Sequence, residues 1–262
     1  MIAAARAVGR IVGCLGFLAG WGIVHLLALP FCARGRRRER WRRNVLGGGC
    51  RGVLRILGIG VTIEGTAPAR PGILVTNHLG YVDVLVLGSI LDVVFVSRDD
   101  VRDWPLIGPF ARASGTVFLD RERKRQLPQV VEVLRAWNAR GTRIVFFPEG
   151  TSGRGDVVMP FRSSLFEAAV RAGATVHAAA LDYRTAPGDA PAEVAVCWWG
   201  DTGFAPHAWR LLRLREVRAR VTFSDAEIAP TDRKTVAREA QAAVEKVFRP
   251  SAEATEVTVD PA

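Results

Sequence analysis

Residues 73–83 carry the sequence Ile-Leu-Val-Thr-Asn-His-Leu-Gly-Tyr-Val-Asp, and this stretch decides the expected fold. The apolar run at 73–76 predicts a strand, Gly80 permits a tight turn, and an apolar helix is expected to follow. His78 then stands where the strand ends, and Asp83 falls in the first turn of the helix. A strand that turns directly into a helix is the repeating unit of α/β domains, whose ligand groups collect at strand ends.

Short strands and helices alternate on both sides of this stretch. The expected strands are rich in Val, Ile, Phe and Thr and cover residues 61–64, 73–76, 93–97, 116–119, 143–147, 175–182, 193–198 and 217–223. The expected helices cover residues 81–91, 106–113, 123–139, 163–172, 206–214 and 232–248. We therefore predict an α/β fold with a mixed, largely parallel sheet flanked by helices over residues 60–250, followed by a flexible tail at 251–262.

The N-terminal part of the chain has a different character. Residues 11–33 contain no Asp, Glu, Lys or Arg, and as a helix they would be about 34 Å long, enough to cross a hydrocarbon layer. Seven Arg and one Glu follow at 34–43, and this Arg-rich collar favours the cytoplasmic side of a membrane. Residues 1–59 are expected to form a membrane anchor. It either spans the bilayer or, with a second apolar stretch at 53–63, dips into one leaflet as two helices.

The overall composition excludes several classes of protein. With 262 residues, 49% of them hydrophobic, the chain is neither collagen-like nor disordered. The net charge of +10 is concentrated in the Arg-rich collar, so it does not indicate a nucleic-acid partner. The four cysteines are far apart in the sequence, and this spacing fits neither a disulfide framework nor a zinc site.

His78 and Asp83 are the first candidates for catalysis. A carboxylate that accepts a hydrogen bond from one ring nitrogen fixes the tautomer of the imidazole, which then serves as a general base. The alternative is that Asp83 caps the helix beside a histidine with a purely structural role. The same turn raises a further hypothesis, that backbone N–H groups around Gly80 stabilise an oxyanion.

Two further stretches place polar groups at strand ends. In the first, Phe118-Leu119-Asp120-Arg121, a strand delivers Arg121. In the second, residues 144–155, an apolar strand runs into Pro-Glu-Gly-Thr-Ser-Gly-Arg-Gly, where glycine N–H groups, Thr151, Ser152 and Arg154 can contact an anion. Glu149 in the same turn can accept a hydrogen bond from a substrate hydroxyl. The stretch lacks the spacing of a nucleotide P-loop.

In this order and at this spacing, NHLGYVD, FLDR and FPEGT resemble the first three motifs of the PlsC-like glycerolipid acyltransferases of the 1-acylglycerol-3-phosphate type. The resemblance covers about residues 60–225. It implies that His78 deprotonates the hydroxyl of a lysolipid acceptor and that Asp83 orients His78. It also implies that Arg121 binds the headgroup phosphate and that Glu149, Gly150 and Thr151 hold the acceptor.

The resemblance further implies direct attack of the hydroxyl on the thioester of acyl-CoA or acyl-carrier protein, at a membrane, without a metal or other cofactor. The absence of a GxSxG nucleophile elbow agrees with a mechanism that forms no acyl-enzyme. The most favoured acceptor is 1-acyl-sn-glycerol-3-phosphate, giving phosphatidic acid.

One departure from the family pattern leaves the acceptor open. The position after EGT is usually Arg, whereas here it is Ser152, and the nearest arginine is Arg154. This form is more similar to a subgroup that includes lyso-ornithine lipid acyltransferases, so a lyso-aminolipid is the alternative acceptor. A non-catalytic basic membrane tether is an alternative of another class. Deletion of residues 1–43 is expected to distinguish the enzyme from the tether. The enzyme would keep a foldable domain with weak activity, whereas the tether would keep no function.

Overall fold

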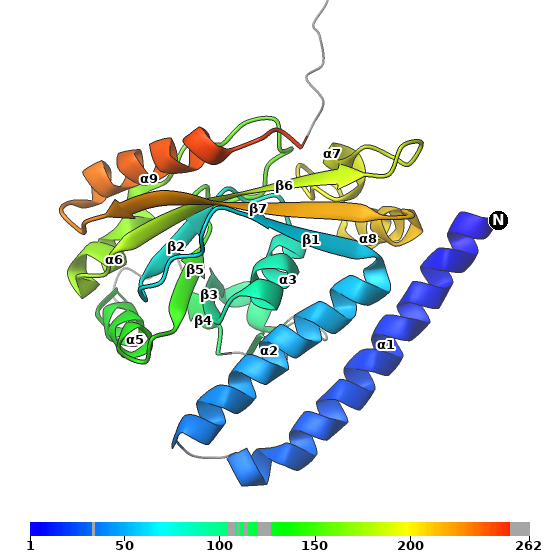
Figure 1. Cartoon of the computed structure of the whole chain (residues 1–262), viewed down its shortest axis with the longest axis horizontal. Coiled ribbons are helices and arrows are strands. Elements are labelled where there is room, and N and C mark those ends of the chain that lie inside the picture. Colours follow the sequence, from blue (N-terminus) through cyan, green and yellow to red (C-terminus); the bar gives the residue numbers. More distant parts are fainter. Residues whose placement is uncertain (33–34, 104–107, 109–110, 113–114, 120–126, 252–262) are drawn as a thin grey trace, which may run out of the picture.

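The computed structural model describes residues 1–32, 35–103, 108, 111–112, 115–119 and 127–251. Its centre is a seven-stranded sheet in the order β1-β7-β6-β2-β5-β3-β4 (Figure 1). The strands are β1 (Ile59–Glu64), β2 (Ile73–Thr76), β3 (Val93–Arg98), β4 (Val117–Leu119), β5 (Arg143–Phe146), β6 (Val176–Thr185) and β7 (Val217–Ile228). All neighbouring pairs are parallel except β6 and β7, which are antiparallel. The predicted mixed, largely parallel sheet is confirmed.

Helices cover both faces of the sheet. On one face lie α2 (Gly35–Leu57), α3 (Tyr81–Ile90), α7 (Ala192–Ala195) and α8 (Phe204–Arg213), and on the other lie α5 (Leu127–Ala139), α6 (Glu167–Ala172) and α9 (Arg233–Val247). Figure 1 shows α9 on one side of the sheet and α2 and α3 on the opposite side. Successive residues of a strand point to opposite faces. Leu74 accordingly packs in one core, whereas Ile73 and Val75 pack in the other.

Several predicted boundaries differ from the structure. The strand expected at 193–198 is wrong, because Pro191 begins the short helix α7 there and residues 196–199 follow without regular structure. Val196 and Cys197 are apolar because they are buried in the core, not because they pair in the sheet. The helix expected at 163–172 is divided into a 3-10 helix η4 (Ser163–Phe166) and α6. The helix expected at 106–113 lies mostly outside the described residues.

The apolar N-terminal segment is one long helix, α1 (Ile2–Ala28), followed by the 3-10 helix η1 (Leu29–Cys32). Helix α1 begins nine residues earlier than the expected span and lies antiparallel to α2 along its length (Figure 1). Gly48 and Gly52 of α2 permit this approach, because a Cβ atom there would lie 2.4 Å from the Trp21 ring and 2.0 Å from the Phe17 ring, respectively. The stretch Ile2–Phe31 is long and apolar enough to cross a membrane.

Two arginines tie the start of α1 to the end of α8. Arg6 Nη1 donates to the carbonyl of Arg213 at 2.8 Å, and Arg10 Nη1 donates to the carbonyl of Leu214 at 2.6 Å. Arg10 also donates to the carbonyls of Leu212 and Arg215. The carbonyls of Leu212 and Arg213 are among those that a helix leaves unpaired at its C-terminus, and Leu214 and Arg215 follow directly. Side chains of the anchor therefore cap a helix of the α/β domain.

The Arg-rich collar has two kinds of arginine. Arg37, Arg38 and Arg40 are exposed, as expected for contact with lipid headgroups. Arg42 is instead buried, and its guanidinium donates to Asp92 Oδ1 at 2.7 Å and to the carbonyl of Val93 at 3.0 Å. Residues 46–57 of α2 also contribute side chains to the core on the α3 side of the sheet, so α2 packs against the α/β domain.

The C-terminal tail begins later than expected. Ser251 is buried, its N–H donates to the carbonyl of Gly155 at 2.6 Å, and its hydroxyl accepts from the N–H of Tyr183 at 2.9 Å. Residue 251 therefore belongs to the folded domain, and residues 252–262 lie outside the described part of the chain.

Candidate active site

His78 and Asp83 lie together at the end of β2, as predicted. His78 Nδ1 and Asp83 Oδ2 are 2.7 Å apart, the Asp83 side chain is fully buried, and the His78 side chain is 23% exposed. A carboxylate only accepts hydrogen bonds, so Nδ1 of His78 is the donor and Nε2 carries the lone pair. The imidazole is thus prepared to take a proton through Nε2.

Asp83 also organises the turn before α3. Its Oδ2 accepts from the N–H of Leu79 at 2.7 Å and from the N–H of Gly80 at 3.0 Å. Asp83 therefore caps the helix and binds the histidine at once, so the two interpretations are not alternatives. The hypothesis of an oxyanion site at Gly80 is wrong for these two N–H groups, because the carboxylate already occupies them.

Phe147 and the backbone of Trp198 contact the turn from two sides. The His78 ring stacks on Phe147, with centroids 4.0 Å apart and planes 16° from parallel. On the other side the N–H of Trp198 donates to the carbonyl of Leu79 at 2.7 Å. A Cβ atom on Gly80 would lie 3.1 Å from Cβ of Trp198, and its φ of 148° is one that favours glycine.

Glu149 joins the EGT turn to the histidine through the backbone. Its Oε2 accepts from the N–H of His78 and its Oε1 from the N–H of Met159, both at 3.1 Å. Glu149 is buried, and this burial raises the pKa of its carboxyl to about 8, against the opposing effect of the two N–H donors. Both carboxyl oxygens bond to this chain's own backbone, whereas the sequence led us to expect a contact with the acceptor.

The remaining residues of the turn differ in what they contact. Thr151 is exposed, and Gly150 adopts a φ of 79° with the Arg162 side chain packed against it. The Ser152 hydroxyl donates to the carbonyl of Trp198. Arg154 forms an ion pair with Glu193, with Nη2 3.0 Å and Nε 3.1 Å from Oε2. Arg154 thus fastens the turn to α7, and Ser152 fastens it to the segment after α7.

Arg121 lies outside the described residues, so its placement at the end of β4 stays a prediction.

Tyr183 is a site residue that the sequence analysis did not identify. Its hydroxyl donates to Asp83 Oδ1 at 2.6 Å, across 100 positions of sequence. Tyr183 directly follows the strand expected at 175–182, and this position alone does not indicate a contact with Asp83.

No described group of three His, Cys, Asp or Glu side chains could hold a metal ion. The cysteines whose side chains the structure describes, Cys14, Cys50 and Cys197, are free thiols. Burial is the main reason why the pKa of Cys197 lies well above its ordinary value, which keeps this thiol protonated and unreactive.

Comparison with known proteins places the chain in a family. The acyltransferase family model matches residues 59–182. A 1-acyl-sn-glycerol-3-phosphate acyltransferase of Neisseria meningitidis serogroup B is 31% identical over 175 residues, which are 66% of this chain and 68% of that protein. The chain belongs to the acyltransferase family.

Other acyltransferases agree with this assignment. A lyso-ornithine lipid O-acyltransferase of Rhodobacter capsulatus is 35% identical over 206 residues, which are 74% of this chain and 72% of that protein. The crystal structure of the 1-acyl-sn-glycerophosphate acyltransferase PlsC of Thermotoga maritima has a TM-score of 0.64 at 18% identity, over 92% of this chain and 94% of that one. This structural likeness shows that the fold is shared. The protein is therefore an acyltransferase enzyme with the fold of PlsC, and its apolar α1 and its relatives indicate association with a membrane.

Proposed function

We propose that the enzyme transfers a fatty acyl group from an acyl thioester to the free hydroxyl of a lysolipid at the membrane surface, with His78 as general base. One observation carries this proposal. The Nδ1 atom of His78 is hydrogen-bonded at 2.7 Å to a fully buried carboxylate, which leaves Nε2 to take the proton of an attacking hydroxyl.

The reaction proceeds without a covalent enzyme intermediate. The acceptor oxygen attacks the thioester carbonyl while His78 Nε2 removes its proton, and Asp83 stabilises the imidazolium that forms. The tetrahedral intermediate then collapses, the C–S bond breaks, and the imidazolium returns the proton to the leaving thiolate. The products are the acylated lipid and the free thiol of CoA or of acyl-carrier protein.

The hairpin of α1 and α2 supports a location on one face of the membrane. Exposed apolar side chains of α1 and η1, among them Val12, Leu15, Leu27 and Phe31, form a surface suited to lipid. The Arg-rich start of α2 lies beside the end of α1, which suits anionic headgroups better than the bilayer centre. We therefore infer that the hairpin dips into the cytoplasmic leaflet and that the α/β domain lies on the cytoplasmic side.

We propose two candidate acceptors, a lysolipid with a phosphate headgroup and a lyso-ornithine lipid. The EGT motif and the Neisseria relative favour 1-acyl-sn-glycerol-3-phosphate, whose phosphate Arg121, Gly150 and Thr151 would bind. The ion pair of Arg154 with Glu193 favours the second candidate, a lyso-ornithine lipid, because a neutralised guanidinium contributes less to a phosphate site. The Rhodobacter relative supports this second candidate.

The test is an acyl-transfer assay on the purified enzyme in mixed micelles, with labelled acyl-CoA or acyl-carrier protein and each acceptor in parallel. We expect transfer to one acceptor and its loss in His78→Ala. The control is His177→Gln, a histidine on β6 that pairs with the middle of β2 and is expected to leave transfer intact.

Two results would refute the proposal. Full transfer by His78→Ala would exclude this histidine as the base. Binding to anionic vesicles without transfer to either acceptor from either donor would favour the non-catalytic tether.

A further inference from the structure

The hydroxyl of Tyr183 is buried against the carboxylate of the catalytic pair. Tyr183 and Asp83 are both fully buried, and the hydroxyl oxygen lies 2.6 Å from Asp83 Oδ1. Burial is the first of the causes that raise the pKa of Tyr183 well above its ordinary value, and the adjacent carboxylate adds to it. The hydroxyl therefore remains protonated and acts as a donor.

The two oxygens of Asp83 have different surroundings. Oδ2 accepts from His78 Nδ1 and from the N–H groups of Leu79 and Gly80. Among the described residues, the hydrogen-bond donor to Oδ1 is Tyr183. Donors on both oxygens fix the plane of the carboxylate, and this plane sets the direction in which the His78 ring is held.

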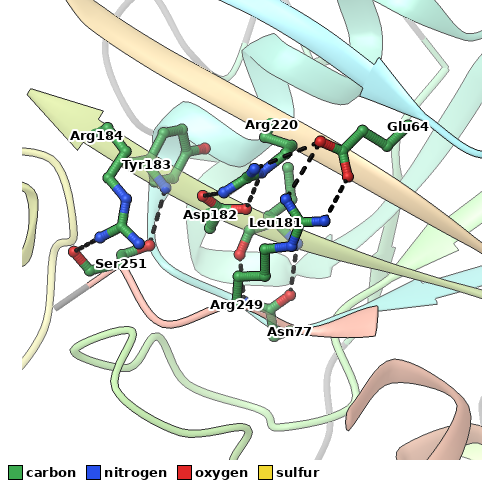
Figure 2. A network of polar contacts seen from close by, with 9 residues as sticks. All are labelled: Glu64, Asn77, Leu181, Asp182, Tyr183, Arg184, Arg220, Arg249 and Ser251. Atoms are coloured by element: carbon green, nitrogen blue, oxygen red, sulfur yellow. Dashed lines mark hydrogen bonds and ion pairs between the residues drawn. The ribbon is translucent and has the colours of Figure 1, made fainter. Parts of the chain in front are cut away.

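Tyr183 is itself held firmly by polar contacts around β6 (Figure 2). The Ser251 hydroxyl accepts from its backbone N–H, and the Asn77 amide exchanges two hydrogen bonds with Leu181, at 2.9 and 2.8 Å. Asp182, between them, binds Arg220 through both carboxylate oxygens, at 2.8 and 2.9 Å. The strand that carries Tyr183 is thereby fixed to β2, to β7 and to the C-terminal segment.

We propose that Tyr183 is a positioning residue for acyl transfer, which holds Asp83 so that the His78 imidazole keeps its reactive orientation. This inference rests on the proposed function of His78. It adds a third member, from a strand 100 positions away in the sequence, to a pair that lies within a single turn.

The proposal predicts a change in pH dependence as well as in rate. The hydroxyl shares the negative charge of Asp83, and without it the carboxylate favours the protonated, inactive imidazole more strongly. Within the described part of the chain, the other titratable groups that act on the pair or on Tyr183 are Glu149, Cys197 and Asp182. The substitution changes none of them, so the shift can be assigned to the lost hydroxyl.

The test compares Tyr183→Phe with Tyr81→Phe. Tyr81 is the only other tyrosine in the chain, and its hydroxyl contacts His207 Nδ1 at 3.0 Å instead of the catalytic pair. Both variants lose one hydroxyl hydrogen bond, so both are expected to unfold at a slightly lower temperature. For Tyr183→Phe alone we expect kcat to fall about tenfold or more, as for loss of a hydrogen bond to a charged group. KM values for donor and acceptor should change by less than about threefold. In the pH profile of kcat, the acid limb should move to higher pH by about half a unit or more.

The possible outcomes separate this inference from the proposed function. An unshifted acid limb and a kcat within twofold of the unsubstituted enzyme would overturn the role of Tyr183, whatever the effect on unfolding. The same would follow if Tyr81→Phe shifted the acid limb equally. Failure of the unsubstituted enzyme to transfer acyl groups would instead refute the proposed function.

Discussion

Replacement of Glu149 tests whether the EGT glutamate binds substrate or the protein's own backbone. Its two carboxyl oxygens accept from the N–H groups of His78 and Met159 at 3.1 Å each. In Glu149→Gln one of these oxygens becomes an NH₂ group, which cannot accept from an N–H. In Glu149→Ala both N–H groups lose their acceptor.

The expected magnitude follows from the number of hydrogen bonds lost. A buried or half-buried donor left unpaired costs about 1–3 kcal/mol. At pH 5, where the folded state keeps Glu149 protonated, Glu149→Gln should therefore reduce the free energy of unfolding by about 1–3 kcal/mol, and Glu149→Ala by about twice that amount. For a domain of this size, 1 kcal/mol corresponds to about 2–4 °C in Tm, so the Gln variant should unfold about 2–12 °C lower.

The pH dependence gives a second measure. Burial raises the pKa of the Glu149 carboxyl from 4.5 to about 8, so between these values the folded state holds a proton that the unfolded state releases. The stability of the unsubstituted enzyme should therefore fall relative to Glu149→Gln as the pH rises from 5 to 8. The slope cannot exceed about 1.4 kcal/mol per pH unit for a single proton.

The assay is the unfolding temperature in detergent at pH 5–9, together with KM for the acceptor. A Glu149→Gln enzyme with unchanged Tm, a parallel pH profile and a raised acceptor KM would refute our reasoning. That result would restore the role expected from the sequence, in which the carboxylate holds the acceptor.

Three further predictions concern other parts of the molecule. Arg42→Ala should reduce the free energy of unfolding by about 2–4 kcal/mol because it removes the buried partner of Asp92. Replacement of the exposed Arg38 by Ala should instead weaken binding to vesicles without lowering Tm. Equal Tm values for the two variants would contradict the burial of Arg42. Gly80→Ala should lower the free energy of unfolding by about 1–3 kcal/mol and abolish most of the activity. The reason is that the φ of 148° and the nearby backbone of Trp198 leave little room for a Cβ atom. An active, stable variant would show that the turn can relax. Arg121→Ala should raise KM for a phosphate-bearing acceptor more than KM for the acyl donor, and equal changes in steady-state kinetics would argue against a headgroup role.

Local patterns predicted the fold and the contact between His78 and Asp83 well. The run at 73–83 encodes a strand, a tight turn and a helix within 11 residues, so the contact of His78 with Asp83 needs no information from elsewhere in the chain. The prediction of a strand at 193–198 failed because a buried loop can contain the same apolar residues as a strand. Val196 and Cys197 are apolar because they fill the core beside α7, and no local pattern distinguishes this from a strand.

Contacts between distant segments could not be predicted. From the sequence, Arg154 is expected to be available to bind an anion, because nothing local indicates its partner Glu193, which is 39 positions away. The same holds for Tyr183 and Asp83. Side chains with ordinary sequence surroundings acquire their roles only when the order of the strands brings them together.

The arginine caps between α1 and α8 affect how the enzyme can be shortened. Removal of residues 1–43 would take away Arg6, Arg10 and Arg42 and would expose the carbonyls at the end of α8 to water. It would also open the glycine face of α2 against which Phe17 and Trp21 pack. The simple deletion suggested by the hydropathy pattern is thus expected to damage the α/β domain. A water-soluble version should instead keep the hairpin and replace the outward apolar side chains of α1 by polar ones.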